Sequence, residues 1–249
     1  SKKIEVIVVD NTSTDNTKAI ARKYTSQVFD WGPERAAQRN FGVQKAKGDY
    51  ILYLDADMEL HMQVIESCIE KFRQNSEIVG LYISEFVTGD QFFSRVRRFE
   101  RHFYDGTVID CARFIRRKVF LDLKGFDEII TGPEDWDFDK RLRKAGKVEL
   151  VHTPIYHNEA KFDLKKYITK KKYYAASFDA YIDKWGKDDP DIIRQFSFWY
   201  RFFWVFLEKG KWRQLLRHPH LAIGMYFLRF LVGLVFLGRR WFRISTTPY

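Results

Sequence analysis

The chain contains the sequence YILYLDADM at residues 50–58. The first five residues form an apolar run with the length of a buried strand, and Asp55 and Asp57 follow it directly. Two carboxylates at positions i and i+2 after a strand can hold a hard divalent cation and share it with a diphosphate. The alternative is that Asp57 only caps the helix that follows.

The segments on either side of this strand alternate between strand and helix patterns. The sequence predicts a strand at residues 4–9 and helices at residues 17–23, 35–46 and 61–72. Short apolar strands that alternate with helices predict an α/β sandwich with a largely parallel central sheet, covered on both faces. Ligands of such sheets bind at the carboxyl ends of the strands, so the polar residues there are the candidates for a site.

Composition sets limits on the class of protein and divides the chain in two. Of the 249 residues, 45% are hydrophobic and 31% charged, which excludes a disordered segment, and two cysteines exclude a disulfide scaffold or a zinc cluster. The net charge is +10, but residues 1–160 carry −1 and residues 161–249 carry +11. We therefore expect a catalytic domain at residues 1–160 and a basic, aromatic, helical region at residues 161–249.

The residues before the strand extend the pattern into a family resemblance. Residues 35–49 read RAAQRNFGVQKAKGD, so an Arg-Asn-x-Gly helix and an Ala-x-Gly turn precede the strand and its Asp-x-Asp. This order resembles the family 2 glycosyltransferases, which have the Rossmann-like GT-A fold. The resemblance implies a nucleotide-sugar donor, UDP- or GDP-linked, with Arg39 near the nucleotide. The alternative for Arg39 is a solvated helix face.

The loop at residues 8–17, VVDNTSTDNT, is similar to the family's loop that contacts the donor's base. The resemblance implies that Asp10, Asn11 and Asp15 bind the nucleotide sugar together with Asp55. Asn11 replaces a second Asp of the usual pattern. Members of the family normally have another strand and helix before the strand at residue 4, and without them we expect weaker nucleotide binding.

A third block, GPEDWDF at residues 132–138, also matches the family pattern. The resemblance implies that Asp135 is the general base of an inverting transfer, with Glu134 beside it. A sugar hydroxyl is a poor nucleophile near neutral pH, so a carboxylate must take its proton as it attacks. The alternative is that both residues are only the acidic first turn of a helix.

The departing nucleoside diphosphate gains negative charge, which a cation can stabilise. Asp57, Asp55 and His157 are the predicted metal ligands, and oxygen-rich sites of this kind suit Mg²⁺ or Mn²⁺. His157 follows a short predicted strand in the segment VHTPIYH. A structural histidine is the alternative.

The last third of the chain combines positive charge with aromatic residues, of which 15 lie between Phe196 and Phe242. Residues 221–237 approach the length of a membrane span, but Arg229 at their middle argues against one. We expect C-terminal amphipathic helices at an anionic membrane surface, while burial against the enzyme domain is the alternative. Nucleic acid is not an expected partner, because the run at residues 202–207 is too apolar to stay in water.

These features lead to one expected function and two alternatives. We expect an inverting, metal-dependent glycosyltransferase that acts on a hydroxyl of a lipid-linked saccharide at the cytoplasmic face of a membrane, as a peripheral or monotopic protein. A polyprenyl phosphate acceptor is the first alternative, but it is already ionised and needs no base. A non-catalytic membrane scaffold with the transferase fold is the second.

Overall fold

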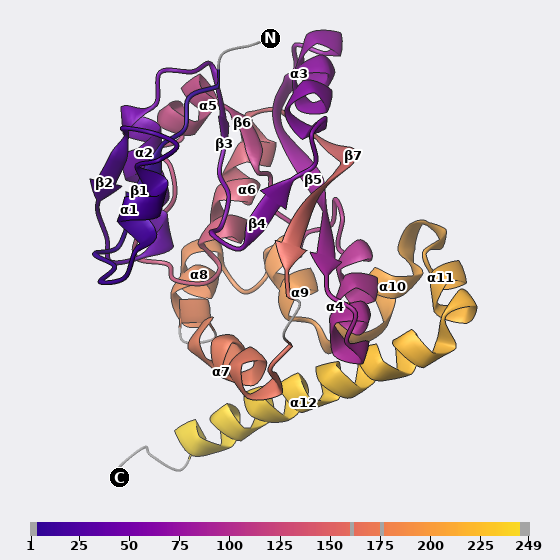
Figure 1. Ribbon diagram of the computed structural model, residues 1–249. Coiled ribbons are helices and arrows are strands. Elements are labelled where there is room, and N and C mark those ends of the chain that lie inside the picture. Colours follow the sequence, from indigo (N-terminus) through magenta and orange to yellow (C-terminus); the bar gives the residue numbers. More distant parts are fainter. Residues whose placement is uncertain (1–3, 160–161, 175–176, 245–249) are drawn as a thin grey trace. The chain divides into compact units, whose positions relative to one another are not determined.

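A computed structural model of the protein describes residues 4–159, 162–174 and 177–244 (Figure 1). The chain divides into two compact units. The first unit comprises Ser1–Asp55, Ile65–Ile83 and Cys111–Val151, and the second comprises Ala56–Val64, Ser84–Asp110 and His152–Tyr249. The predicted boundary between residues 160 and 161 falls outside the described residues and stays a prediction.

The first unit is an α/β structure, as expected from the alternating sequence pattern. Its elements in chain order are β1 (Val8–Asp10), α1 (Thr17–Ala21), β2 (Val28–Asp30), α2 (Arg35–Lys45), β3 (Tyr50–Leu52), most of α3 (Val64–Gln74), the first half of β5 (Ile78–Thr88), β6 (Phe114–Arg116), α5 (Arg117–Asp122), α6 (Glu134–Ala145) and the start of β7 (Lys147–Asn158). Strands β1 and β2 pair in parallel as a separate two-stranded sheet. The remaining strands of this unit follow the order β3-β6-β5-β7.

The direction of the strands differs from the prediction of a largely parallel sheet, which was wrong. Strands β3 and β6 are antiparallel, and so are β5 and β6. Apolar periodicity identifies a strand but carries no information on its direction, which the path of the chain decides. Here β6 runs toward the start of β3, where the Arg117 amide donates to the Asp49 carbonyl (2.8 Å), so the two strands run in opposite directions.

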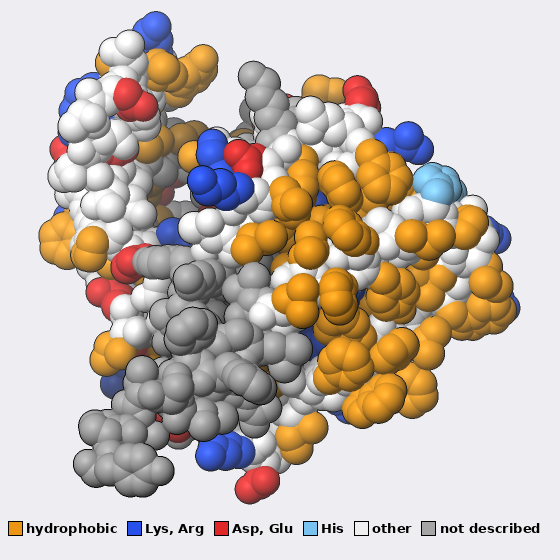
Figure 2. All heavy atoms as spheres, turned by 90° about the horizontal axis from the view of Figure 1, so that it is seen from below, with side chains coloured by type: hydrophobic (Ala, Val, Ile, Leu, Met, Phe, Trp, Pro, Cys, Tyr) orange, Lys and Arg blue, Asp and Glu red, His pale blue; other side chains and the backbone are white. Residues whose placement is uncertain are grey.

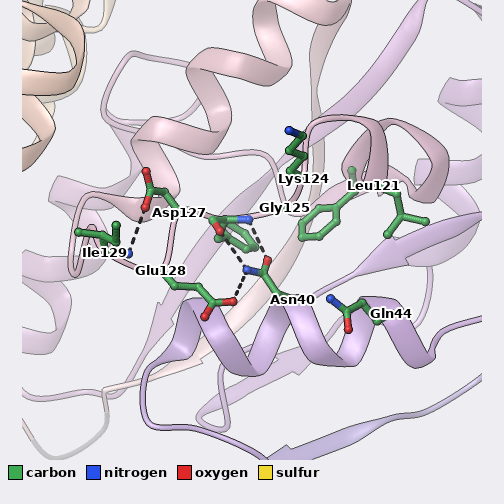
Figure 3. Close-up of a pocket in the computed structure, with 10 residues that line it drawn as sticks. Asn40, Gln44, Leu121, Lys124, Gly125, Asp127, Glu128 and Ile129 are labelled. Atoms are coloured by element: carbon green, nitrogen blue, oxygen red, sulfur yellow. Dashed lines mark hydrogen bonds between the residues drawn. The ribbon is translucent and has the colours of Figure 1, made fainter.

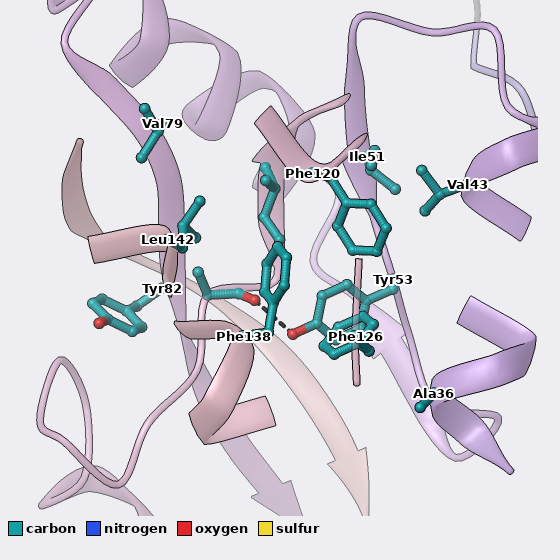
Figure 4. Packing of buried hydrophobic residues seen from close by; sticks show 12 residues of the cluster. Ala36, Val43, Ile51, Tyr53, Val79, Tyr82, Phe120, Phe126, Phe138 and Leu142 are labelled. Carbon is teal, nitrogen blue, oxygen red and sulfur yellow. Dashed lines mark hydrogen bonds between the residues drawn. The ribbon is translucent and has the colours of Figure 1, made fainter. Parts of the chain in front are cut away.

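Aromatic rings fill the core of the first unit. Phe120, Phe126 and Phe138 form a triangle with ring centroids 4.9–5.4 Å apart, and Tyr53 meets Phe126 edge-on (Figure 4). The Tyr53 hydroxyl donates to the Ala112 carbonyl (2.6 Å), which satisfies the polar end of a buried ring. This core fixes the end of β3 against the loop that precedes α6.

Local sequence explains where α6 begins and ends. Three acidic residues occupy its first turn, and Arg143 and Lys144 occupy its last, which suits the helix dipole at both ends. Leu142 packs against Gly80 of β5, where an added Cβ would lie 2.6 Å from the leucine methyl group. The helix thus has a fixed position on the sheet of the first unit.

The second unit combines a short stretch of sheet with helices. It holds β4 (Met58–Leu60), the second halves of β5 and β7, α4 (Phe92–His102), α7 (Leu164–Tyr174), α8 (Phe178–Trp185), α9 (Pro190–Phe196), the π-helix η2 (Tyr200–Trp204), α10 (Val205–Leu207), the 3₁₀ turn η3 (Glu208–Gly210), α11 (Trp212–Arg217) and α12 (Pro219–Ile244). Strand β4 pairs with β7 in antiparallel register, with Met58 opposite His157.

Helix α12 lies along α4 in the core of the second unit (Figure 1). Gly224 allows the close approach, since an added Cβ would lie 2.7 Å from the Val96 side chain. Arg229 is buried here, and its Nη1 donates to Glu100 (2.7 Å) and to the Tyr104 hydroxyl (2.5 Å). Among the described residues, no helix combines the length and the apolar character that crossing a bilayer requires.

The aromatic triangle gives a stability prediction. Phe138→Ala should lower the free energy of unfolding by about 3–5 kcal/mol, because it removes a buried ring and leaves a cavity. Urea denaturation followed by circular dichroism measures the change. Ile129→Ala is the matched control, since that side chain is 83% exposed and its loss should cost less than about 0.5 kcal/mol.

Candidate active site

The loop after β1 carries the three residues predicted to bind the nucleotide. Asp10 is buried and accepts a hydrogen bond from the Ser13 amide (2.6 Å). Asn11 donates to the Pro33 carbonyl (2.8 Å), and Asp15 accepts from the Thr17 amide (2.9 Å). All three side chains thus bond the backbone around them, so they shape this loop at the carboxyl end of β1.

Trp31 directly follows the neighbouring strand β2 and lies beside this loop. Its amide donates to the Asp10 carbonyl (2.9 Å), and its ring stacks on Phe41 with centroids 4.7 Å apart. The residue remains 49% exposed. An aromatic surface is therefore held at the strand ends where a flat ligand can stack.

Arg39 on α2 links two of the predicted carboxylates. Its Nη2 donates to Asp55 (2.7 Å), and its Nη1 donates to Asp135 (2.7 Å). The guanidinium lies over the rings of Tyr53 and Phe126, 4.6 and 5.4 Å from their centroids. With its side chain only 8% exposed, Arg39 is a buried cation between two anions and not a solvated helix-face residue.

Asp55 has a second cation nearby, since Arg113 Nη2 lies 3.7 Å from its other oxygen. Burial alone would raise the pKa of Asp55, but Arg39 and Arg113 outweigh burial and lower it. Asp55 is therefore ionised at neutral pH and held in a fixed orientation at the end of β3.

Glu134 and Asp135 lie in the first turn of α6 and differ in their contacts. Glu134 accepts hydrogen bonds on both oxygens, from Arg35 (2.6 Å) and from the Gly132 amide (2.6 Å). Burial and the neighbouring charge of Asp135 raise the pKa of Glu134, while Arg35 opposes the shift. Asp135 accepts from Arg39 on Oδ1, and its side chain is 19% exposed. Asp135 is thus the more accessible of the two carboxylates.

The second unit contains the other predicted group, Asp57 and His157. Pairing of β4 with β7 brings His157 Nε2 within 3.1 Å of Asp57 Oδ2. The other ring nitrogen lies 2.6 Å from Glu85, which is itself paired with Arg101 (3.2 Å). Burial would lower the pKa of His157, but its bonds to Asp57 and Glu85 raise it to about 9.

These contacts allow a test of whether a divalent cation fits. In the described part of the chain, no three or more His, Cys, Asp or Glu side chains are grouped so as to hold a metal ion. Asp57 and His157 nevertheless supply an oxygen and a nitrogen donor side by side, and Glu85 fixes the outer ring nitrogen as a carboxylate does for metal-bound histidines. The pair therefore fits as part of a metal site. Asp55, the third predicted ligand, is bound by Arg39 in the first unit.

A comparison with known protein families identifies the first half of the chain. Residues 1–124 match the family model described as glycosyl transferase family 2. The chain belongs to glycosyltransferase family 2. The motifs of the resemblance from the loop after β1 to the Asp-x-Asp lie inside this match, and the third block, at residues 132–138, lies beyond it.

Relatives and solved structures agree with this family. Glycosyltransferase AglE of Haloferax volcanii is 37% identical over 159 residues, which are 58% of this chain and 52% of AglE. The chain spans about half the length of AglE and a quarter of another curated relative, so the activity of the whole protein does not follow from these matches.

Two solved structures show that the chain has the GT-A fold. The mannosyltransferase PcManGT of Pyrobaculum calidifontis, in complex with GDP-Man and Mn²⁺, has a TM-score of 0.55 at 16% identity and covers 95% of this chain and 73% of its own. S. aureus TarS (residues 1–349) in complex with UDP-GlcNAc has a TM-score of 0.50 at 16% identity and covers 89% of this chain and 70% of its own. The prediction of the GT-A fold is therefore confirmed.

A pocket of about 530 Å³ lies next to the site around Arg39 in the first unit (Figure 3). Asn40, the neighbour of Arg39, donates to the Phe126 carbonyl (2.9 Å) and accepts from the Phe126 amide (2.8 Å). It also donates to Glu128 (2.8 Å). Asn40 thus fastens the loop at residues 125–128 to α2. This attachment holds Phe126 against the guanidinium of Arg39.

Sequence reasoning missed Arg35, Arg113 and Trp31 in the first unit and Glu85 in the second. A charged residue inside a buried strand was a readable signal for Glu85, since β5 is otherwise largely apolar. Trp31 could have been found as an aromatic residue directly after a strand. Nothing in the local pattern around Arg113 indicates a contact with Asp55 across 58 positions.

The ion pairs of Arg39 with Asp55 and Asp135, which we call the Arg39 bridge, give a prediction for this residue. Arg39→Met should destabilise the protein by about 3–5 kcal/mol and raise the pKa of Asp55, because it leaves two carboxylates without their shared cation. Urea denaturation and NMR titration of labelled aspartates measure the two effects. Lys118→Met is the control, because it removes an ion pair with Asp122 at the surface and should change stability by less than about 1 kcal/mol. Unchanged stability of Arg39→Met would contradict the bridge.

Proposed function

We propose that the protein transfers a sugar, with inversion, from a nucleotide-sugar donor to a hydroxyl group of a lipid-linked saccharide. The observation that carries this proposal is the Arg39 bridge. It fixes Asp135, the candidate base, beside Asp55, the first carboxylate after β3. A base and a donor-binding carboxylate are then held by one guanidinium within the first unit.

The contacts of the two acidic residues on α6 divide their roles. Both oxygens of Glu134 are occupied by Arg35 and the Gly132 amide, so Glu134 is a positioning residue that holds the loop before α6. Asp135 is the accessible carboxylate and takes the proton of the acceptor hydroxyl. The acceptor oxygen forms its bond to the anomeric carbon as the bond from that carbon to the diphosphate oxygen breaks. The nucleoside diphosphate leaves with the electron pair.

The donor is proposed to lie along the strand ends of the first unit. The base stacks on Trp31 beside the loop of Asp10, Asn11 and Asp15, and Asp55 accepts a hydrogen bond from a hydroxyl of the sugar moiety. The exposed half of the Trp31 ring and the fixed orientation of Asp55 support this placement. Solved structures of the same fold bind UDP-GlcNAc in TarS and GDP-Man in PcManGT, and we propose a donor of this class.

Asp57 and His157 are proposed to hold a divalent cation, Mg²⁺ or Mn²⁺. When bound, such a cation stabilises negative charge on the diphosphate. Glu85 orients the ring of His157, and Arg101 in turn orients Glu85.

The acceptor is proposed to be a hydroxyl and not a phosphate, because a phosphate is already ionised and gives Asp135 no proton to remove. We place the reaction at the cytoplasmic face of a membrane. The basic and aromatic composition of residues 161–249 supports the membrane surface.

The proposed base leads to a prediction on rate. Asp135→Asn should lower the rate of transfer to a hydroxyl acceptor by about 10²–10⁴-fold, since it removes the proton acceptor and keeps the side chain's shape. The assay measures release of nucleoside diphosphate from a panel of UDP- and GDP-sugars, with saccharide and polyprenyl phosphate acceptors side by side. Calorimetry with the donor is the control and should show unchanged binding. An undiminished rate on the hydroxyl acceptor would end the assignment.

The proposed cation site leads to a prediction on metal binding. Asp57→Asn and His157→Ala should each abolish Mn²⁺-dependent binding of a nucleoside diphosphate in calorimetry, because each removes a donor atom. Glu85→Gln should weaken it by about 10–100-fold, since the outer ring nitrogen loses its charged partner. Glu66→Gln, a change of an exposed glutamate on α3, serves as the control. Full Mn²⁺ dependence in Asp57→Asn would exclude this pair as the site.

A further inference from the structure

Helix α12 is apolar on two opposite stripes. Leu221, Met225 and Leu228 form the buried stripe, which belongs to the core shared with α4. Ile223, Phe227, Phe230 and Leu234 form the other stripe and are exposed. Their spacing of three or four residues places them on one side of the helix, where a surface helix normally carries polar residues.

A second row of exposed apolar side chains lies in residues 198–207. It comprises Phe198, Trp199, Phe203, Trp204 and Leu207. Phe203 contacts Tyr226 of α12, with ring centroids 6.4 Å apart, so the two rows belong to one surface. Figure 2 shows hydrophobic side chains gathered over a broad area of the face seen from below α12. We call these nine residues, the four on α12 and the five here, the outward apolar face.

The charge around this face is strongly positive. Residues 201–234, whose side chains the structure describes, contain six Lys and Arg and one acidic residue, Glu208. Arg201 and Arg229 are turned inward, where the guanidinium of Arg229 donates to the Arg201 carbonyl. Lys209, Arg213 and Arg217 are exposed on the segments between the two rows, so cations flank the apolar side chains.

We propose that the outward apolar face binds the surface of an anionic lipid bilayer. Exposed Trp and Phe rings enter the headgroup and acyl boundary, while flanking Lys and Arg pair with lipid phosphates. The buried ion pair of Arg229 with Glu100 keeps α12 on the protein, so the helix lies in the plane of the surface. This inference rests on the proposed function for its purpose, which is to bring the site to a lipid-linked acceptor.

Charge distinguishes a bilayer from a second copy of the chain. Two copies that met through this face would bring two clusters of exposed cations together, with Glu208 as the one acidic residue of residues 201–249. Like charges at short range oppose such a contact. Anionic lipid supplies the opposite charge together with an apolar interior, and it satisfies both parts of the face at once.

Vesicle flotation with the full chain tests the proposal. The protein should float with vesicles of phosphatidylcholine and phosphatidylglycerol, and about tenfold less with phosphatidylcholine alone or at high salt, because electrostatic attraction is lost. The double variants Trp199→Gln/Trp204→Gln and Ile223→Gln/Phe230→Gln should each lower binding by at least about tenfold. Tyr24→Gln is the control, since Tyr24 is 81% exposed on the first unit. Arg213→Gln/Arg217→Gln should reduce the preference for the anionic lipid.

Three results would overturn the proposal. One is a wild-type protein that stays unbound with anionic vesicles, a result that does not depend on how any variant folds. Another is that both apolar double variants bind the anionic vesicles as strongly as the wild type does. The third is a lipid-free dimer in light scattering that these substitutions convert to monomers, which would assign the face to a second copy.

The outcomes also separate this proposal from the proposed function. Asp135→Asn should bind vesicles like the wild type while it loses transfer. The apolar variants should keep transfer to a short, water-soluble hydroxyl acceptor and lose vesicle binding. If the wild type transfers sugar but does not bind vesicles, only the membrane inference is overturned. If it binds vesicles but does not transfer sugar, only the proposed transferase activity is overturned.

Discussion

The buried guanidinium of Arg39 is the constraint on which the first unit depends. A cation that is 8% exposed needs anionic partners, because removal from water without them costs several kcal/mol. Arg39 finds them in Asp55 and Asp135, which lie 16 and 96 positions away. Helix α2, the end of β3 and the start of α6 must therefore meet at one point. The rings of Tyr53 and Phe126 close the remaining sides of the guanidinium.

This arrangement sets the chemistry available to each carboxylate. Asp55 stays ionised because two arginines outweigh the effect of burial on its pKa. Glu134 has a raised pKa because of burial and the charge of Asp135, and both of its oxygens are occupied. Asp135 remains the carboxylate that is both oriented and accessible. One cation thus orders two carboxylates, and the division of roles follows from their contacts and not from their sequence positions.

The sequence predicted the α/β class and the carboxylates that meet at Arg39, because each lies in a short motif next to a strand or helix end. It did not predict strand direction, since periodicity is the same in parallel and antiparallel strands. Glu85 escaped notice because its partner, His157, lies 72 positions further along the chain. The charge of Arg229 argued against a membrane span, but nothing in the sequence indicated its ion pair, because Glu100 lies 129 positions away.

The ion pair of Arg229 and Glu100 explains how α12 can bury one apolar stripe in the core and expose the other. An apolar helix without a fixed orientation would bury whichever stripe packs best, but a charged pair inside the second unit permits one rotation of α12 about its axis. The cost of burying the pair is partly offset by the Tyr104 hydroxyl and the Arg201 carbonyl, which accept further hydrogen bonds from the two Nη atoms of the guanidinium. The stripe of Ile223, Phe227 and Phe230 is then held outward. Burial of the charged pair and exposure of the apolar stripe are thus two consequences of the same rotation.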